Sequence, residues 1–154
     1  MPAIAHKFGL HRAAGVTTLV LTLFSLPLQA DRAHDVLSTI NYVATALAGD
    51  NAADAMTPFD KSFPNYVKLR DYFEGLTDGW QIVNEVDVTD EEDSATQSNI
   101  TVQWTMTLTN KSTFQIERRS GQIHLRLALE HGKWKVVDFS PIDFFDPQPK
   151  QQSK

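Results

Sequence analysis

The chain has 154 residues, 42% of them hydrophobic, which is enough for one domain with its own core. Its 14 basic and 19 acidic side chains give a net charge of −5, which argues against nucleic acid or an anionic membrane surface as a partner. No cysteine is present, so no disulfide can form within the chain.

The first 30 residues have the composition of a secretory signal peptide. Two basic side chains precede an apolar run over residues 13–28, no acidic residue appears before Asp31, and the small residue Ala30 offers a cleavage site. The run is shorter than the roughly 20 apolar residues of a membrane-spanning helix. We therefore expect cleavage after Ala30 and a periplasmic or extracellular bacterial protein with a net charge of −7 and no membrane contact. An uncleaved anchor is the alternative.

A first helix is predicted directly after this segment. Asp31 can serve as its N-cap, and Gly49 supplies a C-terminal stop. Between these two residues, apolar side chains recur at the spacing of one helical face. They are Val36, Leu37, Ile40, Val43, Ala44 and Leu47.

Two further helices follow. Asp50 or Asn51 caps a short one, which Pro58 closes. Pro64 suits the first turn of a third helix, and Asp78-Gly79 ends it. The apolar stripe of the third helix consists of Tyr66, Leu69, Phe73 and Leu76.

The second half of the chain alternates apolar and polar residues with a period of two. This pattern predicts strands with one buried and one polar face. Asn84 has the parity of the apolar face, and the acidic run Asp90–Asp93 is expected to form a connecting loop. The predicted strands are 80–88, 100–108, 114–129 and 133–140, the last stopped by Pro141.

The length of the loop after residue 108 sets the register of the second and third strands. A three-residue loop, Asn110–Ser112, brings apolar residues together. In the third strand, the apolar residues occupy even-numbered positions up to Ile116 but odd-numbered positions from Ile123 onward. One extra residue would keep them on the same face, so a β-bulge is predicted at Ser120-Gly121. The predicted pairs are Leu108 with Phe114, Met106 with Ile116, and Trp104 with Arg118.

A two-residue turn at His131-Gly132 sets the register of the last two strands. This register places the large apolar residues on one face, and it places the polar residue Asp138 on the same face. The predicted pairs are Leu129 with Trp134, Leu127 with Val136, and Leu125 with Asp138. Residues 142–145 are expected to fold back onto the body, and residues 147–154 to form a disordered polar tail.

Three helices followed by four antiparallel strands indicate an α+β fold, with helices covering the apolar face of a curved sheet. The chain resembles the nuclear transport factor 2-like superfamily, which includes SnoaL-like polyketide cyclases and ketosteroid isomerase. The resemblance rests on the helical run Val36–Leu47 leading into Ala48–Ala52, and on the closing segment Gly132–Phe139. It covers the single domain predicted over residues 31–146. It implies a cone whose open end can hold a ligand, and a dimer formed through the sheet.

Polar residues on the apolar face of the sheet are the natural candidates for a ligand pocket, because burying an unpaired polar group costs about 1–3 kcal/mol. In the functional interpretation, Arg118 stacks on Trp104 and pairs with Asp138 at the floor of the pocket. In the structural alternative, Arg118 extends to water at the bulge and Asp138 lies beyond the end of the sheet. The candidate pocket residues are Tyr42, Tyr66, Asn84, Trp104, Arg118 and Asp138.

A catalytic alternative follows from the resemblance. An isomerase of this kind uses a carboxylate base and a tyrosine or protonated aspartate as hydrogen-bond donor. Tyr42 and Asp138 are the nearest candidates for the donor, and Asp54 or Asp60 for the base. A dehydratase-like pair would instead need His34 near Asp138, although a solvated His34 is the simpler expectation. We assign no residue a catalytic role.

The opposite face of the sheet is polar and is a candidate dimer surface. Val137 and Phe139 are predicted to form its apolar centre. The candidate interface residues are Gln103, Thr105, His124, Arg126, Val137 and Phe139.

No motif indicates a metal or a cofactor. The acidic run Asp87–Asp93 lacks the glycine and ligand spacing of a calcium loop. No zinc-protease, phosphate-loop, dinucleotide or nucleophile-elbow motif is present. The sequence therefore predicts a non-catalytic domain that binds a small molecule or a partner. The alternatives are an isomerase or cyclase acting on a small hydrophobic molecule, and a structural dimerisation module.

Overall fold

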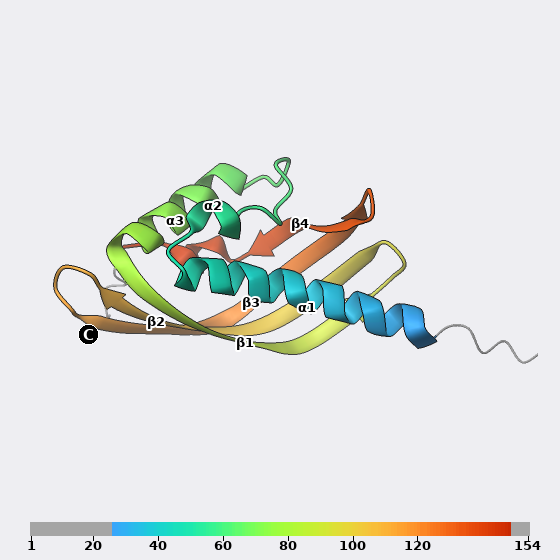
Figure 1. Cartoon of the computed structure of the whole chain (residues 1–154), viewed down its shortest axis with the longest axis horizontal. Coiled ribbons are helices and arrows are strands. Elements are labelled where there is room, and N and C mark those ends of the chain that lie inside the picture. The colour runs from blue at the N-terminus through green and yellow to red at the C-terminus, as the bar shows by residue number, and fades with distance from the viewer. Residues whose placement is uncertain (1–25, 149–154) are drawn as a thin grey trace, which may run out of the picture.

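The computed structural model describes the backbone of residues 26–148 and the side chains of residues 34–148. Three helices lie on one side of a curved four-stranded antiparallel sheet of order β1-β2-β3-β4, which confirms the predicted α+β class (Figure 1). The elements are α1 (Leu26–Ala48), α2 (Ala52–Ala55), α3 (Tyr66–Gly79), β1 (Trp80–Asp93), β2 (Gln97–Asn110), β3 (Ile116–Glu130), β4 (Lys133–Ser140) and the 3₁₀ helix η1 (Ile142–Phe145).

Helix α1 extends further toward the N-terminus than the sequence indicated. It begins at Leu26, so Asp31 lies inside the helix and the prediction of Asp31 as N-cap is wrong. Pro27 lies in the first turn of the helix, where proline is favourable. At the other end, the left-handed residue is Asp50, with φ 58°, and not Gly49. The Asn51 N–H then donates to the Ala46 carbonyl at 2.9 Å, the bond of a Schellman cap.

Helices α2 and α3 both form, but α3 begins at Tyr66 with Asn65 as its N-cap residue, so Pro64 precedes the helix and does not lie in its first turn as predicted. The Asn51 Oδ1 accepts a hydrogen bond from the Asp54 N–H at 3.0 Å, which confirms Asn51 as the N-cap of α2. Helix α3 ends at Gly79, and its buried face includes Leu69, Phe73 and Leu76. All three residues are fully buried against the sheet.

The predicted acidic loop belongs to strand β1. The strand continues to Asp93, which pairs with Ser98 of β2 after a register shift between Val88 and Asp90. The side chains of this extension are exposed. Exposed acidic side chains on an edge strand discourage pairing with another chain.

The register of β2 and β3 differs from the prediction by several residues. Leu108 pairs with Glu117, Met106 with Arg119, and Trp104 with Gly121. The predicted bulge at Ser120-Gly121 is absent from this ladder, because the inward parity of β3 is odd throughout.

This register results from a β2–β3 loop that is longer than the predicted three residues. The Asn110 Oδ1 accepts hydrogen bonds from the N–H groups of Ser112 and Thr113, and the Asn110 carbonyl accepts one from Phe114. Phe114 (76% exposed) and Ile116 (72% exposed) therefore lie outside the core, and not opposite Leu108 and Met106 as predicted.

The turn between β3 and β4 is confirmed. His131 (φ 49°) and Gly132 (φ 77°) both have positive φ, as a type I′ turn requires. Leu129 pairs with Trp134, and Leu127 pairs with Val136.

Beyond those two pairs, the observed register of β3 and β4 differs from the predicted register by one residue. The register shifts at Arg126/Leu127, so Val137 is the extra residue on β4. Phe139, and not Asp138, then pairs with Leu125. Phe139 is fully buried as a result.

The core lies between the helices and the concave face of the sheet and is rich in aromatic side chains. As predicted, η1 folds back and inserts Phe144 and Phe145 into it. Arg119 fixes this return by donating to the carbonyls of Phe144 and Asp146 and, at 3.2 Å, to that of Gln148. Pro147 and Gln148 belong to the predicted tail, and the rest of that tail (149–154) lies outside the described residues.

Candidate functional site

The interior position predicted as the pocket floor is filled by side chains. Trp104 is fully buried and makes edge-to-face contacts with Phe139 and Phe145, at centroid distances of 6.3 and 5.2 Å. Its indole N–H donates to the Asn84 Oδ1 at 2.9 Å, and the Asn84 amide donates to the Ala44 carbonyl at 2.8 Å. Asn84 therefore lies on the inner face, as its parity indicated, where it ties the sheet to α1. Trp104 lines none of the grooves described here, whereas Asn84 borders a hollow of about 330 Å³ between α1 and β1.

Two predicted pocket residues lie on the wrong side of the sheet for that role. Arg118 is exposed on the outer face, with its guanidinium 3.8 Å from the Glu85 carboxylate. Asp138 is also exposed, and it accepts a hydrogen bond from the Phe139 N–H at 2.9 Å. The functional interpretation, in which Arg118 stacks on Trp104 and pairs with Asp138, is wrong. Arg118 extends to water, as in the structural alternative.

The buried arginine is Arg119, which the sequence analysis did not select. Its side chain is 5% exposed, and its Nε lies 2.5 Å from the Glu117 carboxylate. If the alternation that places Ile123 on the inner face is followed back along β3 without a bulge, Arg119 also lies on the inner face. The predicted bulge concealed that signal.

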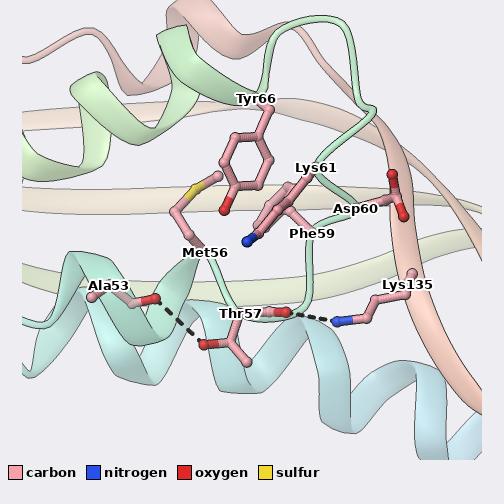
Figure 2. A pocket seen from close by; sticks show the side chains of 8 residues that line it. All are labelled: Ala53, Met56, Thr57, Phe59, Asp60, Lys61, Tyr66 and Lys135. Carbon is pink, nitrogen blue, oxygen red and sulfur yellow. Dashed lines mark hydrogen bonds between the residues drawn. The ribbon is translucent and has the colours of Figure 1, made fainter.

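An open groove of about 480 Å³ lies between β4 and the stretch from α2 to the start of α3 (residues 53–66, here the α2–α3 segment) (Figure 2). Met56 and Phe59, which are 4% and 3% exposed, form an apolar floor. Tyr66, the first residue of α3 and a predicted pocket residue, forms one wall. The lining residues are Ala53, Met56, Thr57, Phe59, Asp60, Lys61, Tyr66 and Lys135.

Backbone hydrogen bonds hold residues 58–60 of the α2–α3 segment against β4. The Val136 N–H donates to the Pro58 carbonyl and the Asp60 N–H donates to the Val136 carbonyl, both at 2.9 Å. Phe59 thereby forms a parallel bridge with Val136. Its ring contacts Phe139 edge-to-face at 5.2 Å, so the floor of the groove is continuous with the core.

The charged groups of the groove have different environments. The Asp60 carboxylate accepts hydrogen bonds from the Ser62 N–H, at 2.6 Å, and from the Ser62 hydroxyl. These bonds hold the pKa of Asp60 below its ordinary value. Figure 2 shows this carboxylate turned away from Lys61 and Tyr66. The Lys135 ammonium donates to the Thr57 carbonyl at 2.9 Å.

A second groove of about 330 Å³ begins on the other side of the Thr57–Lys135 contact. Tyr42, another predicted pocket residue, is 45% exposed in its wall. The second groove is lined by Ser38, Thr39, Tyr42, Thr57, Pro58, Lys133, Trp134 and Lys135.

The outer face of the sheet is not covered by any of the described helices (Figure 1). Gln103 and Thr105 bond across the strands to the Ser120 hydroxyl, each at 2.9 Å. His124 and Arg126 are exposed on this face, beside a hollow of about 370 Å³ that Asp138 also borders. The predicted apolar centre is wrong, because Phe139 points into the core and Val137 is only half exposed.

Within the described part of the chain, no three His, Asp or Glu side chains are placed to hold a metal ion. Among residues 26–148, no helix has the length and apolarity needed to cross a membrane. His34 is exposed on α1.

Comparison with known proteins identifies relatives by structure alone. No family model matches the sequence, and no curated protein matches it. A conserved protein from Planctomyces limnophilus matches with a TM-score of 0.66 and 9% identity, over 72% of this chain and 94% of that one.

Two further matches have names that describe their family. A nuclear transport factor 2-like superfamily protein from Salmonella enterica serovar Typhimurium matches with a TM-score of 0.58 and 11% identity, over 73% of this chain and 92% of its own. A ketosteroid isomerase-like protein from Erwinia carotovora atroseptica matches with a TM-score of 0.58 and 13% identity, over 69% and 91%. At these identities the likeness establishes the fold: this chain has the α+β cone fold of nuclear transport factor 2-like proteins.

Proposed function

We propose that this protein is a non-catalytic binding domain that holds a small molecule in the groove between the α2–α3 segment and β4. One observation carries the proposal. Aromatic side chains fill the interior of the cone around Trp104, whereas this groove is open and combines an apolar floor with Tyr66 and two lysines. An apolar surface with a few convergent polar groups is the usual composition of a small-molecule site.

The carboxylates near the groove favour binding over catalysis. A general acid of the isomerase type needs a carboxyl group whose pKa is raised by burial. Asp60, the carboxylate in the groove wall, has a lowered pKa because Ser62 stabilises its charged form. The pKa of Glu91 is raised by partial loss of hydration and by the nearby Asp93 carboxylate, but Glu91 lies in the exposed β1 extension and does not line this groove.

The proposal can be tested by mapping amide chemical shifts of the full chain while a library of small metabolites is added. Binding at the groove should shift residues 56–61, 66 and 135, and should leave the outer face at Thr105 unchanged. The Ala53→Phe variant fills the groove from an exposed position of α2 and should abolish the shifts. Ala48→Phe, at another exposed helical alanine, is the matched control. Shifts that persist in Ala53→Phe would contradict the proposal.

Self-association through the outer sheet face is a second candidate function. Val83 (60% exposed) and Ile116 (72% exposed) lie on this uncovered face, on the strands either side of Thr107 and Thr109 of β2. The outward residues of β2 from Thr101 to Thr109 are all uncharged, and an uncharged central strand with exposed apolar neighbours at one end suits a second copy of the chain.

Light scattering of the full chain tests this second candidate. The wild type should have twice the mass of a single chain. Thr105→Arg, which places like charges opposite each other in a two-fold pair, should reduce it to one chain. A monomeric wild type would rule out the dimer.

Export is also a proposal. It rests on the basic start, the apolar run and the small residue Ala30 in the first 30 residues. Cleavage would place Asp31 in the first turn of the shortened helix, where a negative charge is favourable. N-terminal sequencing after secretion from a bacterial host should read from Asp31. A mature protein that retains Met1 would refute cleavage.

A further inference from the structure

We infer that the two grooves beside β4 form one site for a small anionic amphiphile. The acidic head group would lie between Lys61 and Lys135, and the apolar chain would cross the Thr57–Lys135 contact onto Trp134 and Tyr42. This inference rests on the proposed function and names the class of ligand.

The two grooves are adjacent and share a boundary. Thr57 and Lys135 line both of them, and the hydrogen bond from the Lys135 ammonium to the Thr57 carbonyl separates them. This boundary consists of the half-exposed Lys135 side chain and the Thr57 carbonyl that accepts its hydrogen bond. A ligand that takes the place of the Thr57 carbonyl as the acceptor for Lys135 would displace this side chain and lie across both grooves.

The charge of the combined site favours an anion. Its wall carries three lysines, at 61, 133 and 135, and one aspartate, Asp60. The chain as a whole is acidic, with a net charge of −5, so this is a local excess of positive charge. The Asp60 carboxylate accepts hydrogen bonds from Ser62, and the three lysines outnumber it in the wall of the site. Among the described residues, Lys61 forms no ion pair within 4.0 Å.

The second groove suits an apolar chain. Tyr42 contributes a ring that is 45% exposed, Trp134 is half-buried against the core, and Pro58 lies between α1 and β4. Apolar surface of this kind is covered favourably by methylene groups. The site is therefore cationic at one end and aromatic at the other, which matches an amphiphile better than a compact polar metabolite.

Isothermal titration of the full chain with decanoate, decanol and decyltrimethylammonium, each kept monomeric, tests the ligand class. Decanoate should bind at least tenfold more tightly than the other two probes, because only decanoate satisfies the lysines. From hexanoate to decanoate, the affinity should rise about two- to fourfold for each methylene group that is covered. Equal affinity for the three head groups would overturn the inference.

Two variants and one control locate the site. Lys61→Met and Lys135→Met should each weaken decanoate binding at least fivefold. Lys68→Met removes an exposed cation that pairs with Asp143 outside both grooves, and should leave binding unchanged. Tyr42→Ala should flatten the dependence on chain length without removing the preference for an anion. Variants that all bind like the wild type would overturn the inference.

The outcomes also separate this inference from the proposed function. If decanoate does not bind but another small molecule shifts groove resonances, the ligand class is wrong and the binding function stands. If no small molecule perturbs the groove, both are wrong. Co-sedimentation with phosphatidylglycerol vesicles without binding of monomeric decanoate would also overturn the inference, because the ligand would then be a membrane surface.

Discussion

Arg118 and Arg119 are neighbours in β3 but lie on opposite faces of the sheet. Arg118 is exposed and forms a long ion pair with Glu85, 3.8 Å apart. Arg119 is buried and donates hydrogen bonds to backbone carbonyls of the C-terminal segment. An exposed ion pair contributes little to stability, whereas a buried acceptor that loses its donor costs about 1–3 kcal/mol. The two positions therefore form a natural matched pair.

We predict that Arg119→Ala lowers the free energy of unfolding by about 1–3 kcal/mol, because the carbonyls of residues 144–148 lose their donor. Arg118→Ala should change it by less than about 0.5 kcal/mol. Equilibrium urea unfolding of the two variants measures both values. Equal effects would show that the inner position of Arg119 is unimportant for stability.

The Asp60–Ser62 hydrogen bonds predict a pH dependence. Because the pKa of Asp60 is lower in the folded protein, its contribution to stability is fully present above the ordinary value of 3.8. That contribution is lost as the pH falls from 3.8 through the folded-state pKa. Urea unfolding of wild type and Asp60→Asn should therefore differ most near pH 6 and converge in acid. A difference that grows as the pH falls would contradict the assignment.

At the level of elements, the loop between β2 and β3 decides which side chains reach the core. Two hydrogen bonds to the Asn110 side chain shape this loop. It continues through Phe114, which has a φ of 59° and is 76% exposed. A left-handed conformation is unfavourable for a residue with a Cβ atom by about 1–2 kcal/mol. The hydrogen bonds of the loop outweigh this strain.

Phe114→Gly should therefore stabilise the protein by about 1 kcal/mol, because glycine adopts the left-handed conformation without strain. Ser112→Gly, which relieves no positive φ, should destabilise it by about 0.4–1 kcal/mol through the greater entropy of the unfolded chain. Thermal unfolding of both variants tests the pair. A loss of stability in Phe114→Gly would mean that the exposed ring makes a contribution larger than the strain.

At the level of the whole molecule, the aromatic cluster closes the cone from inside. Phe145 contacts Trp104 at 5.2 Å, Phe139 at 5.3 Å and Phe73 at 5.4 Å between ring centroids. These residues come from η1, β2, β4 and α3, so the cluster joins the C-terminal return to the sheet and to a helix. The open grooves consequently lie outside the cluster, beside β4.

Phe145→Ala should lower the free energy of unfolding by about 3–5 kcal/mol, because it leaves a cavity among the other rings. Phe114→Ala removes an equally large but exposed ring and should have little effect. If Phe145→Ala does not fold, Phe145→Leu provides a milder test with a smaller loss. Indistinguishable stabilities for the variants at 145 and 114 would argue against a packed interior.

Local patterns in the sequence were sufficient to predict the α+β class, the three helices and the four strands, and the family resemblance implied the cone. Each element depends on interactions over a few residues: the helical spacing after Val36, the Asn51 cap, and the alternation in β2. The His131-Gly132 turn was also predictable, because a two-residue hairpin requires two residues that accept positive φ.

The site was decided only by the tertiary structure. The Asn110 loop and the extra residue at Val137 change the register, and a shift of one residue moves each side chain to the opposite face of the sheet. Arg119 and Phe139 thus replaced Arg118 and Asp138 on the inner face. The groove joins residues of the 56–61 segment to Lys135 of β4, far away in the sequence, through the bridge between Phe59 and Val136. No local pattern specifies such a contact, because it depends on how the helices pack on the finished sheet.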